Sequence, residues 1–130
     1  MAVSYLDASA GVKLVMAEAE SQAMHRYVRS RPRWTSSALF KTELLRAARR
    51  GDAERLAAAQ VLVRGVALIS IDDSILTSAA GLEPASIRAL DAIHLATALQ
   101  LAGDLEAIVT YDRQMIEGAR ALGLPVASPS

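Results

Sequence analysis

Short apolar runs alternate along the chain with longer segments in which apolar residues recur at helical spacing, and this alternation restricts the possible folds most strongly. The short runs predict five strands, at residues 3–6, 33–36, 66–71, 107–110 and 125–127. The longer segments predict seven helices, at residues 8–16, 21–29, 38–50, 53–63, 74–80, 89–102 and 114–122. Strands that alternate with helices build βαβ units, so the sequence predicts an α/β fold with a parallel sheet between two layers of helices.

Small residues and aspartates mark several predicted helix ends. Asp52 and Asp73 precede or begin helical segments and are predicted N-caps. Glycines follow five predicted helices, where a left-handed residue commonly ends a helix: Gly51, Gly65, Gly81, Gly103 and Gly123.

The length and composition favour one soluble domain. The 130 residues are 52% hydrophobic, which excludes disorder, and no linker or repeat interrupts them, so we expect a single domain over 1–130. The longest segment without a charged residue, 92–103, is shorter than the roughly 18 residues needed to span a bilayer. No signal peptide is recognised and cysteine is absent. We therefore expect a cytoplasmic location and no membrane partner.

The net charge of zero conceals a difference between the two halves of the chain. Residues 1–64 contain 11 Lys or Arg against 6 Asp or Glu, whereas residues 65–130 contain 3 against 8. This asymmetry is compatible with a basic surface beside an acidic pocket, as a nuclease requires. Solvated helix faces would give the same counts.

Four acidic residues lie in apolar surroundings. Asp7 and Asp112 directly follow predicted strands, while Glu43 and Asp91 share helix faces with apolar residues. In a parallel sheet, ligands bind at the carboxyl ends of the strands, which is where Asp7 and Asp112 fall. Buried carboxylates need compensating charge, and a divalent cation with oxygen ligands supplies it. The four residues together predict metal-dependent chemistry on phosphates.

Each of the four carboxylates also has a structural interpretation. Asp7 and Asp112 suit helix N-caps, and Asp91 suits the first turn of a helix, where the helix dipole favours a negative charge. Glu43 could form a structural salt bridge, for instance with an arginine. His94, one turn after Asp91, could approach the site or be an ordinary core histidine.

Several motifs around these carboxylates resemble those of the PIN-domain nucleases, and within them the VapC-type toxins of bacterial toxin–antitoxin pairs. The matching segments are Tyr5-Leu6-Asp7-Ala8-Ser9, Leu90-Asp91-Ala92-Ile93-His94-Leu95-Ala96-Thr97-Ala98-Leu99, Thr110-Tyr111-Asp112 and Gly123-Leu124-Pro125-Val126. The resemblance extends over essentially the whole chain and implies a PIN domain with a central parallel sheet of four to five strands.

The resemblance also implies an activity. By this resemblance we expect a Mg²⁺- or Mn²⁺-dependent endoribonuclease, in which Asp7, Glu43, Asp91 and Asp112 are the catalytic and metal-binding residues. Ser9 and Thr110 map onto hydroxyl positions that orient carboxylates or waters, although Ser9 could equally cap a helix. The implied partners are an RNA substrate, a cognate antitoxin and a second copy in a homodimer. An antitoxin helix is expected in a groove lined by Leu14, Val15, Leu39, Phe40 and Leu44.

Other assignments fit the sequence less well. A haloacid-dehalogenase-like phosphatase requires a second aspartate two residues after the strand-end aspartate, where this chain has Ser9. A response-regulator receiver requires an acidic pair after its first strand, but Asp72-Asp73 follow a middle strand. A PIN-like domain that binds RNA or protein without cleavage stays open as the alternative.

Overall fold

Five parallel strands form one sheet in the order β3-β2-β1-β4-β5. They are β1 (Val3–Leu6), β2 (Trp34–Ser37), β3 (Ala67–Ile69), β4 (Leu105–Val109) and β5 (Val126–Ala127). The computed structural model describes residues 1–130 and confirms the predicted parallel α/β fold. The strand order reverses between β1 and β4, because the chain proceeds from β1 to β2 and β3 on one side and later adds β4 and β5 on the other.

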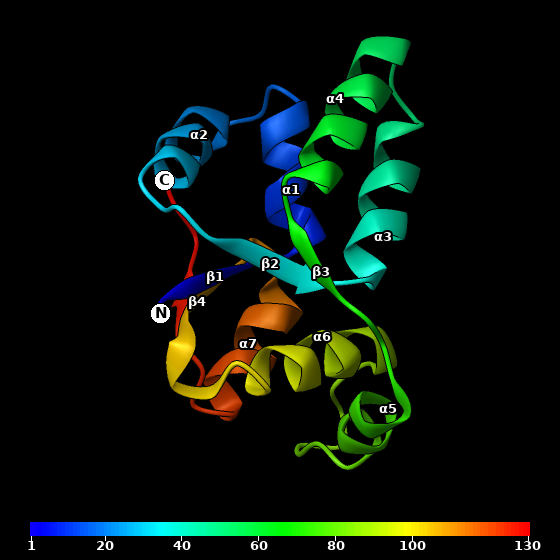
Figure 1. The fold of residues 1–130 in the computed structure, drawn as a ribbon, viewed down its shortest axis with the longest axis vertical. Coiled ribbons are helices and arrows are strands. Elements are labelled where there is room, and N and C mark those ends of the chain that lie inside the picture. Colours follow the sequence, from blue (N-terminus) through cyan, green and yellow to red (C-terminus); the bar gives the residue numbers. More distant parts are fainter.

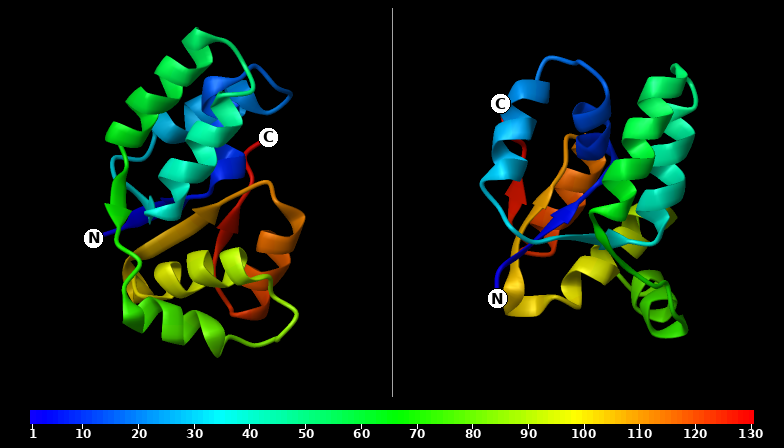
Figure 2. Two further views of the ribbon diagram at one scale, coloured as in Figure 1. Left: turned by 90° about the vertical axis from the view of Figure 1, so that its right-hand side faces the viewer. Right: turned by 45° about the horizontal axis from the view of Figure 1, so that its top comes forward.

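Seven α-helices cover the two faces of this sheet (Figure 1). One face carries α1 (Ala8–Val15), α2 (Ser21–Arg29), α3 (Leu39–Ala48) and α4 (Ala53–Arg64). The other carries α5 (Asp73–Ala80), α6 (Ala89–Leu99) and α7 (Arg113–Ala121), with a short 3₁₀ turn, η1 (Ala102–Asp104), before β4. Both views of Figure 2 show the same two layers. No helix is long and apolar enough to cross a membrane.

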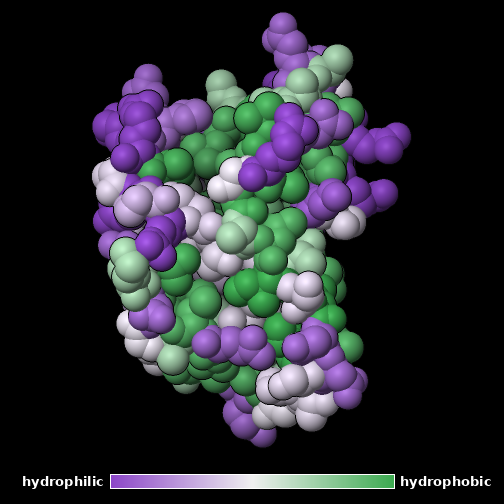
Figure 3. Space-filling view, viewed as in Figure 1, coloured by the Kyte–Doolittle hydropathy of each residue, from purple (hydrophilic) through white to green (hydrophobic).

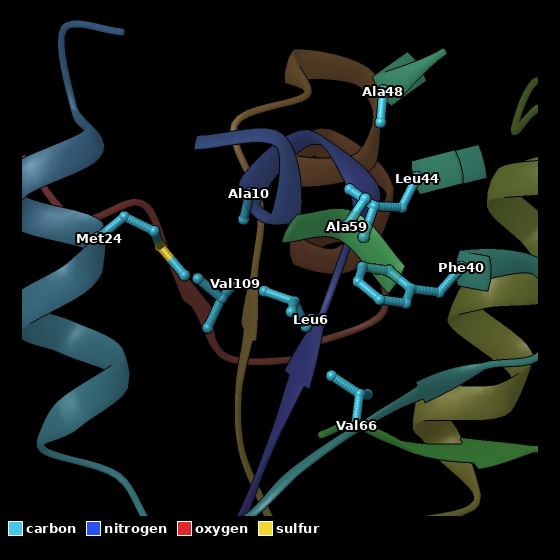
Figure 4. Packing of buried hydrophobic residues seen from close by; sticks show 9 residues of the cluster. All are labelled: Leu6, Ala10, Met24, Phe40, Leu44, Ala48, Ala59, Val66 and Val109. Carbon is cyan, nitrogen blue, oxygen red and sulfur yellow. The ribbon is translucent and has the colours of Figure 1, made fainter. Parts of the chain in front are cut away.

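Side chains of the central strands alternate between the two helix layers. Leu6 and Val109 belong to a buried cluster with residues of α1–α4, whereas Tyr5 and Ile108 belong to a second cluster with residues of α6 and α7. This is the two-residue period expected of strands buried on both faces. Figure 4 shows the first cluster, which consists of Leu6, Ala10, Met24, Phe40, Leu44, Ala48, Ala59, Val66 and Val109.

Phe40 and Leu44 lie inside this cluster with no exposed surface. The expectation that both residues line a groove for an antitoxin helix is therefore wrong. The apolar face of α3 is already used to pack against α1 and α4, because a helix on a sheet must bury one stripe of its surface.

The strands and helices fall within a few residues of their predicted bounds, and the differences concern how the helices end. Gly65 and Gly81 have φ values of −87° and −97° and are not left-handed. Their amides bond to the carbonyls three residues earlier, so each helix ends in a tightened turn. Of the five glycines, only Gly123 has a positive φ, +74°, while Ala102 adopts a positive φ near Gly103. Asp52 caps α4 as predicted, but Asp72 caps α5 in place of Asp73.

The charge difference between the two halves of the sequence becomes a difference between the two faces of the sheet. Residues 1–64 supply α1–α4, and residues 65–130 supply α5–α7. Figure 3 shows hydrophilic residues gathered over α2 and the outer ends of α3 and α4. Exposed arginines lie on these helices and just after α3: Arg26, Arg29, Arg46, Arg49 and Arg50.

Close packing between α1 and α3 depends on Gly11. A Cβ atom at this position would lie 2.9 Å from Cε1 of Phe40 and 3.3 Å from Cδ1 of Leu44. We expect Gly11→Ala to lower the free energy of unfolding by about 1–2 kcal/mol, because overpacking outweighs the gain in helix propensity. Urea denaturation measures this change. Gly103→Ala is the control, since no atom lies within 4 Å of its added Cβ; equal effects of the two variants would contradict the packing argument.

Candidate active site

The predicted acidic residues lie at the carboxyl edge of the sheet, where the strand order reverses. Asp7 follows β1, and Asp112 lies at the N-cap of α7, shortly after β4. Glu43 comes from α3 on one face, and Asp91 comes from α6 on the other. Such a switch point is the usual ligand-binding crevice of an open α/β sheet.

Asp7 is a buried carboxylate held by two hydroxyl groups. Oδ2 accepts hydrogen bonds from Ser9 Oγ at 2.7 Å and from Thr110 Oγ1 at 2.8 Å. Although Asp7 occupies the N-cap position of α1, its side chain makes no capping hydrogen bond. The N-cap interpretation of this side chain is therefore wrong, and Oδ1 has no hydrogen-bond partner in the protein.

The two hydroxyl groups are themselves fixed by the backbone that follows β4. Ser9 Oγ accepts the amide hydrogen of Tyr111 at 2.9 Å, and Thr110 Oγ1 accepts that of Asp112 at 3.1 Å. Each hydroxyl therefore directs its one proton towards Asp7, although the two oxygens are only 3.1 Å apart. Ser9 thus orients a carboxylate and does not cap α1.

Glu43 pairs with a buried histidine instead of an arginine. Its Oε1 lies 2.7 Å from Nε2 of His94, whose side chain is 2% exposed. Nδ1 of His94 lies 2.7 Å from the hydroxyl of Tyr5, which also accepts the amide hydrogen of Ser37 at 3.1 Å. A chain of hydrogen bonds therefore runs from the β2 backbone through Tyr5 and His94 to Glu43.

These hydrogen bonds determine which nitrogen of the neutral His94 imidazole carries the proton. Burial raises the pKa of the Tyr5 hydroxyl well above its ordinary value, so the hydroxyl keeps its proton. A carboxylate oxygen of Glu43 only accepts, so Nε2 carries the hydrogen and donates to it, and Nδ1 then accepts from the Tyr5 hydroxyl. Burial by itself lowers the pKa of His94, but the hydrogen bond to Glu43 and the charges of Glu43, Asp7 and Asp91 raise it above its ordinary value.

Asp91 and Asp112 share a different counter-ion, Arg88. Nη2 of Arg88 lies 2.7 Å from Oδ2 of Asp91 and 3.4 Å from Oδ2 of Asp112. Oδ1 of Asp112 accepts the amide hydrogens of Gln114 and Met115, so this residue also caps α7. The N-cap interpretation therefore describes real contacts of Asp112, and Asp91 does lie in the first turn of α6, but neither position excludes a metal site.

The acidic residues form two adjoining groups. Asp7, Glu43 and His94 each offer one ligand atom, and these atoms lie within 4.8 Å of one another. Thr110 joins this group to the other, because its hydroxyl donates to Asp7 and accepts from the amide of Asp112. Both nitrogens of His94 already take part in hydrogen bonds, so the carboxylate oxygens are the ligands that remain. Carboxylate oxygens suit a hard divalent cation, so the residues present fit a metal ion.

The predicted site residues include neither Arg88 nor Tyr5, and the sequence left open whether His94 approaches the site or belongs to the core. Arg88 supplies part of the positive charge that the sequence suggested a metal would supply, His94 donates a hydrogen bond to Glu43, and Tyr5 fixes His94. The positions contain a weak signal, since Arg88 and His94 each lie three residues from Asp91, about one helical turn. Tyr5 precedes Asp7 by only two residues. Its side chain lies on the face of the sheet that α6 covers, whereas the side chain of Leu6 lies on the other face.

Removal of the Tyr5 hydroxyl tests the hydrogen-bond chain. Tyr5→Phe leaves the buried Ser37 amide and Nδ1 of His94 without partners, so we expect a loss of about 1–3 kcal/mol in the free energy of unfolding. Urea denaturation provides the measurement. Tyr27→Phe removes a hydroxyl outside this chain and is the control; a loss of similar size in both variants would mean that the chain contributes no specific stabilisation.

Comparisons with known proteins find relatives over the full length of the chain. The model of the PIN domain family matches residues 4–121. Ribonuclease VapC46 of Mycobacterium tuberculosis is 45% identical over 131 residues, covering 100% of both chains. Ribonuclease VapC35 of the same species is 43% identical and ribonuclease VapC47 is 34% identical, each over 96% of both chains.

A solved structure extends the similarity to the fold. The crystal structure of Mycobacterium tuberculosis VapC20, a sarcin–ricin loop cleaving toxin, superposes with a TM-score of 0.76 over 97% of this chain and 99% of that one. At 18% identity this match concerns the fold alone. The family model and the full-length relatives together identify the chain: it belongs to the PIN-domain family and, within it, to the VapC ribonucleases.

Proposed function

We propose that the chain is a toxin of a type II toxin–antitoxin system and hydrolyses RNA phosphodiester bonds as an endoribonuclease with Mg²⁺ or Mn²⁺. The observation that carries the proposal is the convergence of four carboxylates from separate elements at one edge of the sheet: Asp7, Glu43, Asp91 and Asp112. The family membership supports the same activity.

These carboxylates would hold the divalent cation through oxygens that the protein leaves free. Oδ1 of Asp7, Oδ1 of Asp91 and Oε2 of Glu43 have no hydrogen-bond partner in the protein. Oδ2 of Asp112 has only the long contact to Arg88. The cation, when bound, makes a water molecule more acidic and offsets the charge of the phosphate.

The surrounding polar side chains orient the ligands. Ser9 and Thr110 hold Oδ2 of Asp7, so Oδ1 has a fixed direction. His94 holds Oε1 of Glu43 from a position that Tyr5 fixes. Because ligands are already oriented before a cation arrives, less conformational entropy is lost on binding.

Partners follow from the same proposal. RNA is the substrate, and the exposed arginines after and within α3, Arg46, Arg49 and Arg50, supply positive charge for its backbone. A cognate antitoxin would inhibit the enzyme, and two copies would form a homodimer in the cytoplasm. We also propose that residues 1–130 act as a single domain. The cleavage experiment below distinguishes the proposed nuclease from a PIN-like domain that binds RNA or protein without cleaving.

Neutralisation of Asp91 tests the activity. We expect Asp91→Asn to reduce Mn²⁺-dependent RNA cleavage at least about a hundredfold while the fold is retained, because the change removes a charge and no core volume. Gel analysis of labelled RNA measures cleavage, and circular dichroism checks the fold. Asp73→Asn, an exposed aspartate outside the site, is the control.

The ends of the products test the mechanism. Attack of water on phosphorus leaves a 5′-phosphate and a 3′-hydroxyl, which enzymatic end-labelling distinguishes. A 2′,3′-cyclic phosphate would show attack by the ribose hydroxyl and contradict hydrolysis. Wild-type protein that binds RNA but does not cleave it would favour the non-catalytic alternative.

Metal binding is detectable without RNA. A ligand that binds only the folded state stabilises it by about 2.7 kcal/mol at a hundredfold excess over its dissociation constant. We therefore expect millimolar Mn²⁺ to raise the melting temperature above its value in EDTA. The rise should be smaller in Asp7→Asn, while Asp73→Asn should respond like wild type. Identical melting temperatures in EDTA and Mn²⁺ would be evidence against the site.

A further inference from the structure

Arg88 places a positive charge where two helices favour a negative one. It occupies the N-cap position of α6, and its side chain reaches Asp112 at the N-cap of α7. The N-terminal end of a helix carries a partial positive charge, which repels a guanidinium and attracts anions such as phosphate. Arg88 is therefore held at this position by carboxylates and not by the helices.

The contacts of Arg88 concentrate on one oxygen. Nε and Nη2 both approach Oδ2 of Asp91, at 2.8 and 2.7 Å, and Nη2 lies 3.4 Å from Oδ2 of Asp112. Nη1 has no partner in the protein, so the guanidinium retains donors. Arg88 is the one cationic side chain that contacts Asp91 and Asp112, and it contacts one oxygen of each carboxylate.

The two members of the main ion pair differ in burial. The Asp91 side chain is 11% exposed, whereas that of Arg88 is 56% exposed. Arg88 borders an open pocket of about 310 Å³ whose lining includes Ser86, Gln114 and Glu117. A half-exposed arginine contributes little net free energy to an ion pair and loses little when its guanidinium turns into water. The mostly buried Asp91 carboxylate, in contrast, is destabilised when it is left without a partner.

We propose that Arg88 is a displaceable counter-ion, which neutralises Asp91 and Asp112 in the metal-free protein and moves to a backbone phosphate of RNA once a divalent cation binds these carboxylates. The inference rests on the proposed function and adds a substrate contact to it. The planar guanidinium can engage a phosphate bidentately, and the two helix N-termini favour an anion at this position. At Asp112 the cation and the guanidinium compete for Oδ2. At Asp91 they lie on different oxygens of one carboxylate, where their like charges repel each other.

This role predicts opposite effects of one substitution on two ligands. Arg88→Gln removes the competing charge, so Mn²⁺ should bind about fivefold more tightly to the RNA-free protein. The same variant lacks a phosphate contact, so RNA should bind less well. If Arg88 only stabilises the fold through its ion pair, Arg88→Gln should bind neither Mn²⁺ nor RNA more tightly than wild type.

The metal arm of the test uses calorimetric titration of Mn²⁺ into the full chain without RNA. Arg88→Lys keeps a cation near the carboxylates and should bind Mn²⁺ like wild type. Arg113→Gln is the matched control, because Arg113 is an exposed arginine beside Asp112 in sequence that forms no ion pair. Mn²⁺ affinity in Arg88→Gln that does not exceed that in Arg113→Gln would overturn the proposal.

The RNA arm uses initial cleavage rates of a short single-stranded RNA of mixed sequence at saturating Mn²⁺. For Arg88→Gln we expect a KM about tenfold higher. The slope of log(kcat/KM) against log salt concentration should become shallower by about 0.7, the contribution of one phosphate contact in single-stranded RNA. Unchanged KM and slope would overturn the transfer to phosphate. If wild type cleaves no RNA, the proposed function fails, while the calorimetric arm still decides whether Arg88 competes with the cation.

Discussion

Parallel pairing of β1 with both β2 and β4 is the constraint on which the rest of the molecule depends. β1 lies at the centre of the sheet, and its side chains alternate between two buried layers, with Leu6 on one side and Tyr5 on the other. The register of β1 against β4 also determines which residues are adjacent just beyond the ends of these two strands. Leu6 lies opposite Val109, so Asp7 and Thr110 are neighbours across the ladder. Their hydrogen bond is therefore a direct product of the sheet.

Charge compensation divides the site into two parts with different rigidity. On one side, Asp7 and Glu43 are held by neutral donors in the protein interior, and these donors are fixed by backbone amides of β2 and of the segment after β4. On the other side, Asp91 and Asp112 depend on an exposed arginine. The first part keeps its geometry without a ligand, because each donor already has its own partner. The second part can exchange its counter-ion.

The sequence predicted the fold well because the strands are short, apolar and separated by helices of clear periodicity. That Asp7 and Asp112 lie at the same edge of the sheet was predictable because each follows a strand closely in the sequence; their catalytic role stays a prediction. The groups that neutralise them were harder to find. His94 reaches Glu43 across 51 residues of sequence, and Arg88 reaches Asp112 across 24, so both pairs exist only after the sheet has formed. Phe40 and Leu44 were misassigned because helical periodicity identifies an apolar face without identifying what covers it.

The hydrogen bonds of Tyr5, His94 and Glu43 connect the two helix layers at the edge of the sheet. Tyr5 points from β1 towards α6, while Glu43 comes from α3 on the opposite layer. His94 on α6 is the link, and it reaches Glu43 at the edge of the sheet, where no strand separates the layers. A small displacement of α6 relative to α3 would lengthen this 2.7 Å contact and leave a nearly buried imidazole nitrogen unpaired, which is costly. The same bond that orients Glu43 therefore also resists sliding of the two layers, so the geometry of the site and the stability of the fold are coupled at His94.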